Sequence, residues 1–179
     1  MRQRIFLLTI ILISAIAAKS QNRRFDLHVI GEATIPLFQN DLGLGGFVKG
    51  MYGVSENGQL TLTAGLSKFK SKNSIENETT MRLIPFLAGY KHNFHQFFIE
   101  PQVGFGELGG NEDIGGDVSR QSVGALFWAM GAGYQVRRFI AGIRFQSVKG
   151  IEGKDAGSWH NKTFHYTGVY IGYALFQKK

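Results

Sequence analysis

The chain has 179 residues, which is enough for one domain with a sizeable core but hardly for two. Its formal net charge is +7, yet no segment is rich enough in lysine and arginine to indicate a nucleic-acid partner. The sequence contains no cysteine, which excludes a disulfide scaffold. Glycine (24 residues) and aromatic residues (13%) are both abundant, and this composition suits a strongly curved β-sheet.

The first twenty residues have the pattern of a secretory signal peptide. Arg2 and Arg4 precede an apolar run over residues 5–16, and small residues follow. The run is shorter than the ~20 apolar residues that a membrane-spanning helix needs. We therefore predict that residues 1–20 are a cleaved signal peptide and that residues 21–179 form the mature domain. Cleavage removes three cationic residues and no acid from the formal charge of +7, which leaves +4.

The mature chain alternates apolar and polar residues in runs of about ten, which is the pattern of β-strands with one apolar face. The run over 97–106 is the clearest, because its large apolar residues share one parity and Glu100 and Gln102 share the other. In chain order, the alternation predicts eight strands, over residues 25–35, 42–54, 59–69, 81–90, 97–106, 122–135, 139–148 and 163–176.

The predicted connections differ in length at the two ends of the strands. Turns after the second, fourth and sixth strands are short, whereas polar loops follow the third, fifth and seventh strands, over 71–78, 109–121 and 149–162. Outer-membrane barrels have an even number of strands, short periplasmic turns and long extracellular loops. We therefore predict an all-β fold, an eight-stranded antiparallel up-and-down transmembrane β-barrel.

Aromatic residues are expected to form two belts around such a barrel, one at each end of an apolar band ~25 Å tall. The short-turn belt would contain Phe25, Tyr52, Tyr90, Phe97, Tyr134, Phe139 and Tyr173 or Phe176. The long-loop belt would contain Phe38, Phe69, Phe105, Phe127, Phe145 and Phe164.

An exported lipocalin-like barrel, with its apolar face around a ligand, would show the same alternation. Loop lengths and aromatic belts favour the membrane barrel, in which the charged minority face points into the lumen. Eight strands leave a lumen just wide enough for side chains to fill. The predicted lumen network is Glu32, Lys49, Arg82, Glu100, Gln102, Arg144 and Gln146. Asp26 is a further candidate for the lumen face.

The strand over 81–90 is apolar on both parities, so alternation alone does not decide which face points inward. A charge on the lipid face costs ~2–4 kcal/mol near the bilayer midplane, which favours Arg82 in the lumen. That choice turns three neighbours toward lipid, namely Met81, Leu83 and Leu87. Pro85 and Pro101 lack the N–H of a ladder bond, so we predict a bulge or a broken bond near each.

Three groups of residues are candidates for chemical sites. His92 and His95 have no third metal ligand nearby in sequence, and residues 111–117 lack the final glutamate of a calcium loop. The third group lies in or beside the last long loop and keeps a lipid A-modifying enzyme open as an alternative: Glu152, Ser158, His160 and His165. The chain contains no G-x-S-x-G motif, and we predict no catalytic, cofactor-binding or metal-binding residue.

The signal peptide, the hairpin LIPFLAGYKHNF–FFIEPQVGFG and the last strand YTGVYIGYALF resemble the porin-family, outer-membrane β-barrel domain proteins of Gram-negative bacteria. Within that family the chain is similar to the small barrels of the OmpA/OmpX type. It differs in that Phe176 is not terminal but is followed by Gln177, Lys178 and Lys179.

The resemblance implies a non-enzymatic, monomeric component of the cell outer membrane with a structural or surface role. Outer-membrane lipid, lipopolysaccharide and the barrel-assembly machinery are its expected partners, and no cofactor and no nucleic acid are expected. The alternatives are the lipid A-modifying barrel enzyme and the lipocalin-like carrier.

Overall fold

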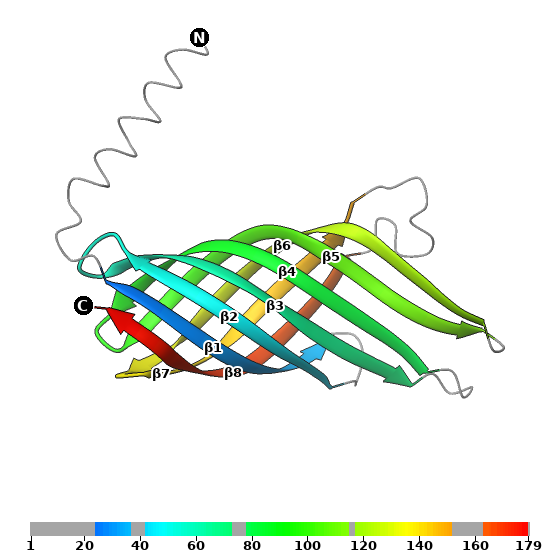
Figure 1. Cartoon of the computed structure of the whole chain (residues 1–179), viewed down its shortest axis with the longest axis horizontal. Helices are drawn as coiled ribbons and strands as arrows, with labels where there is room; N and C mark the ends of the chain where they lie inside the picture. Colours follow the sequence, from blue (N-terminus) through cyan, green and yellow to red (C-terminus); the bar gives the residue numbers. More distant parts are fainter. Residues whose placement is uncertain (1–23, 37–41, 73–77, 115–116, 152–162, 179) are drawn as a thin grey trace, which may run out of the picture.

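The computed structural model describes residues 24–36, 42–72, 78–114, 117–151 and 163–178. They form eight strands: β1 Phe25–Pro36, β2 Gly43–Gly53, β3 Gly58–Lys72, β4 Glu78–Phe94, β5 Phe97–Ile114, β6 Asp117–Val136, β7 Phe139–Gly150 and β8 Thr163–Lys178. Each strand pairs antiparallel with the next, and β1 also pairs with β8, which closes the barrel (Figure 1). The predicted fold class is confirmed. The predicted signal peptide lies outside the described residues.

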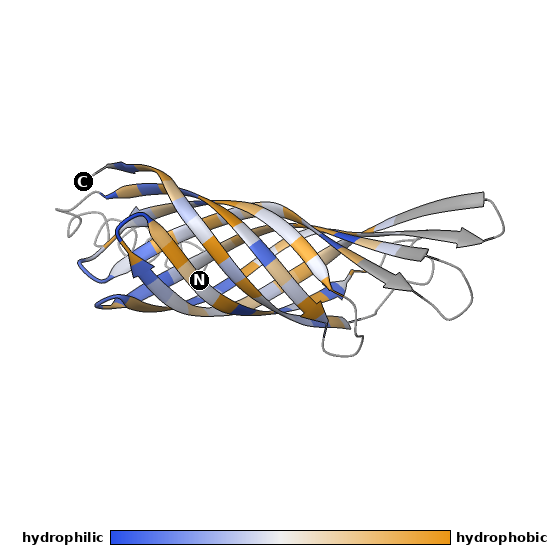
Figure 2. Cartoon of the chain, turned by 90° about the horizontal axis from the view of Figure 1, so that it is seen from below, coloured by the Kyte–Doolittle hydropathy of each residue, from blue (hydrophilic) through white to orange (hydrophobic). Residues whose placement is uncertain are grey.

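The barrel wall is apolar on its outer surface. On β1 the side chains of Phe25, Val29 and Ile35 are exposed, whereas Asp26 and Glu32 are buried inside. The same alternation recurs on the other strands, and hydrophilic residues gather at the turns near the C-terminus (Figure 2). A lipocalin-like carrier would have the opposite arrangement, with its apolar face inside, so this alternative is wrong. The described residues contain no helix that is long and apolar enough to cross a membrane.

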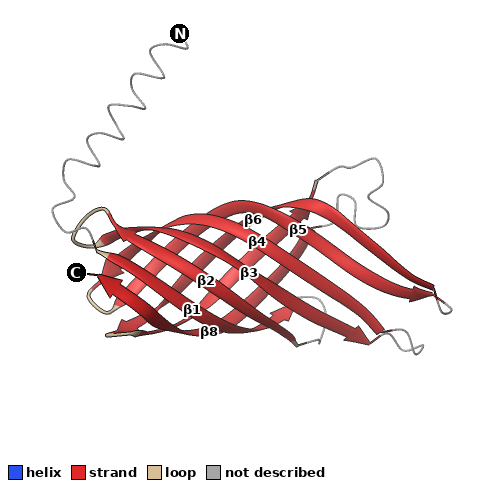
Figure 3. Cartoon of the chain, viewed as in Figure 1, coloured by secondary structure: helices blue, strands red, loops and turns tan. Residues whose placement is uncertain are grey.

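Short turns join the strands at one end of the barrel, hereafter the short-turn end (Figure 3). They comprise residues 54–57, 95–96 and 137–138. His95 and Arg137 have positive φ values of 63° and 51°, the left-handed conformation that two-residue hairpin turns require. The predicted short turns are thus confirmed.

The predicted long loop over 109–121 is wrong. β5 continues to Ile114 and β6 begins at Asp117, and these two residues are cross-strand partners. The strands therefore extend as a two-stranded ribbon beyond the other strands at the opposite, long-loop end (Figure 1). Backbone pairing needs no apolar face, so a polar, glycine-rich segment can be a strand without the alternation that reveals one.

The predicted facing of β4 is also wrong. Met81, Leu83 and Leu87 are buried in the barrel, and Arg82 lies on the outer surface. The pairing explains this orientation, since Leu83 stands opposite the buried Leu108 of β5. Arg82 avoids the expected energetic penalty because it lies near the long-loop end of β4, where a charge on the outer wall costs only ~0–1 kcal/mol.

Both prolines interrupt a strand pairing, as predicted. Two successive pairs are missing from each ladder, Gly65–Pro85 and Leu66–Ile84 from β3–β4 and Tyr90–Pro101 and Lys91–Glu100 from β4–β5, and both ladders resume in the same register. The irregularity is therefore a broken ladder and not a bulge. Gly104 of β5 approaches β4 closely, since an added Cβ would lie 1.9 Å from the carbonyl oxygen of Phe86.

The aromatic belt at the short-turn end is confirmed. All of its members are exposed on the outer wall: Phe25, Tyr52, Tyr90, Phe97, Tyr134, Phe139, Tyr173 and Phe176. The belt at the long-loop end is partly wrong, because Phe69 and Phe127 are buried in the interior. Phe105 is exposed on the outer wall as predicted, and Phe86 and Trp128 are exposed there as well. Phe38 lies outside the described residues.

Candidate functional site: the barrel interior

Two buried ion pairs cross the middle of the interior. The Lys49 Nζ of β2 lies 2.7 Å from the Glu100 Oε2 of β5, and Arg144 of β7 pairs with Glu32 of β1. None of the four side chains is more than 6% exposed. Each charged group contacts a group of opposite charge. A charge that is removed from water without such a partner strongly destabilises the fold. Barrel closure brings these residues together from positions 51 and 112 apart in sequence.

Hydrogen bonds and rings complete the surroundings of the pairs. The Gln102 amide donates to Thr63 Oγ1 and to Glu100 Oε1, each at 3.0 Å. The Arg144 guanidinium lies 4.3 Å from the centroid of the Phe47 ring, within the range of a cation–π interaction. Buried apolar side chains fill the space between the polar groups: Ile30, Phe47, Phe98, Ile140 and Tyr170.

A second polar group lies nearer the short-turn end. Lys91 is fully buried, donates a hydrogen bond to Gln135 and lies 4.4 Å from the Phe98 ring centroid. Asp26, also buried, lies 2.9 Å from the Arg24 Nε. A cavity of about 680 Å³ opens at this mouth, and Arg24, Gln135 and Arg137 belong to its lining. The interior is therefore hydrophilic up to its short-turn opening.

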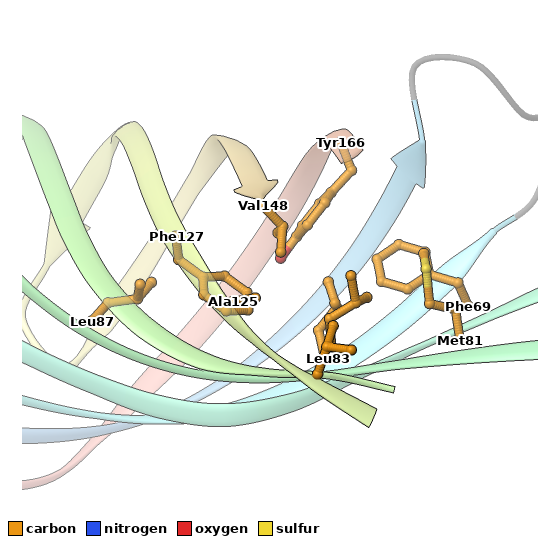
Figure 4. Packing of buried hydrophobic residues seen from close by; sticks show 10 residues of the cluster. Phe69, Met81, Leu83, Leu87, Ala125, Phe127, Val148 and Tyr166 are labelled. Carbon is orange, nitrogen blue, oxygen red and sulfur yellow. The ribbon is translucent and has the colours of Figure 1, made fainter. Parts of the chain in front are cut away.

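The long-loop half of the interior is mainly apolar. Side chains from six strands point toward one another and pack as one cluster (Figure 4). The Phe69 and Tyr166 rings lie 5.2 Å apart, and Leu83 has no exposed surface. The cluster contains Phe69, Met81, Leu83, Leu87, Leu108, Val123, Ala125, Phe127, Val148 and Tyr166. The side chains that fill this half are thus mostly apolar, and Ser67 and Gln146 are polar residues that are buried at the same level.

Six of the seven predicted lumen residues lie in the interior: Glu32, Lys49, Glu100, Gln102, Arg144 and Gln146. Five of them form the central ion pairs and their hydrogen bonds. Gln146, on β7, is fully buried and stands opposite Tyr166 of β8. Arg82 is the exception, since its guanidinium lies on the outer wall, 3.1 Å from the Glu107 carboxylate.

Lys91 is an interior residue that the predicted network omits, whereas Asp26 is buried in the interior as its parity on the first strand suggests. Lys91 falls in the segment predicted as a turn, because the polar sequence after Tyr90 suggested the end of the strand. The position of Lys91 in the alternation does indicate which face of β4 points inward. Lys91 shares its parity with Leu83 and Leu87, so a choice based on Lys91 instead of Arg82 gives the observed facing of β4.

Of the four candidate residues for enzyme chemistry, the structure describes only His165. Glu152, Ser158 and His160 lie outside the described residues. His165 lies on β8, where its ring stacks on Phe145 with centroids 5.9 Å apart. Among the described residues, no group of three or more histidine or acidic side chains is arranged to hold a metal ion.

Comparison with solved structures agrees with this architecture. The Ail attachment invasion locus protein of Yersinia pestis superposes with a TM-score of 0.57 at 10% identity, over 85% of this chain and 97% of Ail. The N-terminal β-barrel domain of Pseudomonas aeruginosa OprF gives 0.56 at 12% identity, over 84% of this chain and 97% of that domain. Neisserial surface protein A gives 0.54 at 12% identity, over 85% of this chain and 96% of that protein.

The chain has the fold of the small eight-stranded outer-membrane β-barrels. At these identities the likeness is one of fold. No family model and no curated protein matches the sequence.

Proposed function

We propose that the protein is an integral outer-membrane barrel with a closed interior, and that its role is structural or surface-related, neither enzymatic nor that of an open pore. The apolar outer wall and the aromatic belt at the short-turn end support insertion into a bilayer. The fold shared with outer-membrane barrels supports the outer membrane as that bilayer.

The observation that carries the proposal is the filling of the interior at two successive levels. The Lys49–Glu100 and Arg144–Glu32 pairs cross the middle, and the apolar cluster fills the long-loop half. An ion crossing this barrel would have to separate buried charge pairs and then enter an apolar region, where it would lose its hydration. Either obstacle opposes conduction.

The proposed orientation places the short turns in the periplasm and the long-loop end at the cell surface. The β5–β6 ribbon and the segments around it would then be the part available to other molecules outside the cell. Lipopolysaccharide and lipid would surround the wall, and the barrel-assembly machinery would insert it.

Conductance measurements on the refolded barrel in planar lipid bilayers test the closed interior. We expect no stepwise current from the wild-type protein, because both levels remain filled. The double variant Phe69→Ala/Phe127→Ala still contains both ion pairs and should also stay closed. A steady ion current through the wild-type barrel would contradict the proposal.

Membrane location is tested separately by fractionating cells that express the full chain. We expect the mature protein in the outer-membrane fraction, with a mobility on gels that changes when the sample is heated. Recovery in the soluble periplasm would contradict the proposed location. Unchanged lipid A in cells that overproduce the protein is expected for a non-enzymatic barrel.

A further inference from the structure

Two cationic side chains stand side by side on the outer wall, at the long-loop end. Lys68 of β3 and Arg82 of β4 are direct cross-strand partners. Lys68 is exposed, and the Arg82 side chain is 49% exposed. Residues in this relation have Cβ atoms about 4.5–5.5 Å apart, and like charges placed there repel each other. The barrel thus contains an arrangement that is unfavourable unless an anion joins it.

The protein itself supplies only part of that negative charge. Glu107 of β5 lies 3.1 Å from Arg82 and is 41% exposed. Lys68 has neither a hydrogen bond nor an ion pair within the described part of the chain. The two cations and the one carboxylate together carry a formal net charge of +1. The Lys68 ammonium group is therefore free to bind an external anion.

The position of the pair indicates where this anion would lie. Below it, the outer wall is apolar, with Leu66 and Leu62 on β3 and Phe86 on β4. Lys68 is two residues beyond Leu66, which corresponds to about 7 Å along a strand. Leu44 of β2, opposite Lys68, is also exposed, so the pair lies near the long-loop edge of the apolar wall, where the proposed membrane location puts the lipid head groups.

The chemistry of the two cations fits a phosphate group. Arginine binds phosphate oxygens through two parallel N–H bonds, and lysine adds a compact positive charge. We propose that Lys68 and Arg82 bind a phosphate group on the sugar head group of the outer-leaflet glycolipid. This inference rests on the proposed outer-membrane location, because that location places phosphorylated glycolipid around the long-loop end.

The test measures binding of lipid A to the refolded full-length mature barrel in detergent micelles. A fluorescent lipid A carrying both phosphates is titrated against the wild type, Lys68→Gln, Arg82→Gln and the double variant. We expect the double variant to bind about tenfold more weakly, a loss of the size that charge-assisted contacts provide. Lys149→Gln is the matched control, because it removes one exposed cation at the same end without a cation opposite. It should bind like the wild type.

Competition experiments distinguish the sources of phosphate. Unlabelled lipid A should displace the probe, whereas lipid A without phosphates and millimolar inorganic phosphate should not. Equal binding by the wild type and the double variant would overturn the site, as would equal competition by dephosphorylated lipid A. Efficient displacement by inorganic phosphate would overturn the lipid as its ligand.

Folding is read independently from heat-modifiable gel mobility in every variant. Variants that fold and lose lipid A binding support the site. Failure of the wild type to fold into detergent or lipid would overturn the membrane barrel and the site together. Normal folding with phosphate-independent binding would overturn the site alone.

Discussion

The two halves of the barrel interior are filled in different ways. Near the short turns and in the middle, the interior contains charged groups such as Lys49, Glu100 and Lys91, each with a partner of specific geometry. Toward the long-loop end it contains packed apolar side chains such as Leu83 and Phe127. Both halves exclude an open channel, but the polar half depends on pairing and the apolar half on shape.

This difference shows that the interior of one eight-stranded barrel can be filled by either polar or apolar side chains. Lipid requires only the outward-facing side chains of the wall to be apolar. The inward-facing side chains can therefore be either polar or apolar. Buried charges are stable only when paired, and apolar side chains only when packed without cavities. Substitutions should therefore have different consequences in the two halves, and the following predictions separate them.

The largest effect is expected from breaking a central ion pair. Glu100→Leu leaves the Lys49 ammonium group buried without its carboxylate, and we expect a loss of about 3–5 kcal/mol of unfolding free energy. Urea titration of the barrel in lipid vesicles measures this loss. The double variant Lys49→Met/Glu100→Leu, which leaves no unpaired charge, should recover much of the stability. A double variant as unstable as the single one would show that the pair itself stabilises the barrel.

A somewhat smaller effect is expected from a cavity in the apolar half. Leu83→Ala removes three buried side-chain carbons from the packed cluster and should lower the unfolding free energy by about 3 kcal/mol. The same urea titration applies. Leu62→Ala removes the same atoms from the outer wall, where the side chain is 70% exposed and lipid can refill the space. Equal losses for the two variants would contradict the packing role of the cluster.

The smallest effect is expected from the ion pair on the outer wall. Glu107→Gln removes the partner of Arg82, and since both side chains are more than 40% exposed we expect a loss below about 1 kcal/mol. The measurement is again the midpoint of urea unfolding, compared at low and high salt. A loss as large as that of Glu100→Leu would mean that the head-group region dehydrates this pair strongly.

The predictable part of the candidate site is the part that lies on strands with clean alternation. Glu32, Lys49, Glu100 and Arg144 occupy the minority parity among apolar neighbours, so their inward direction follows from the pattern. Arg82 could not be placed in this way, because β4 is apolar on both faces. The apolar cluster could not be predicted for the same reason. Where the interior is apolar, the two faces of a strand no longer differ in polarity, and the inward face cannot be recognised from the sequence.

The sequence by itself determined the number of strands, their antiparallel order, the short turns and the aromatic belt at the short-turn end. These features follow from local signals: period-two alternation, turn residues and aromatic residues at strand ends. Only the tertiary structure decided which face of β4 points inward, how far β5 and β6 extend and which charges pair. Alternation shows that a strand has two different faces but not which of them points inward. In a closed barrel, packing against the neighbouring strands decides this.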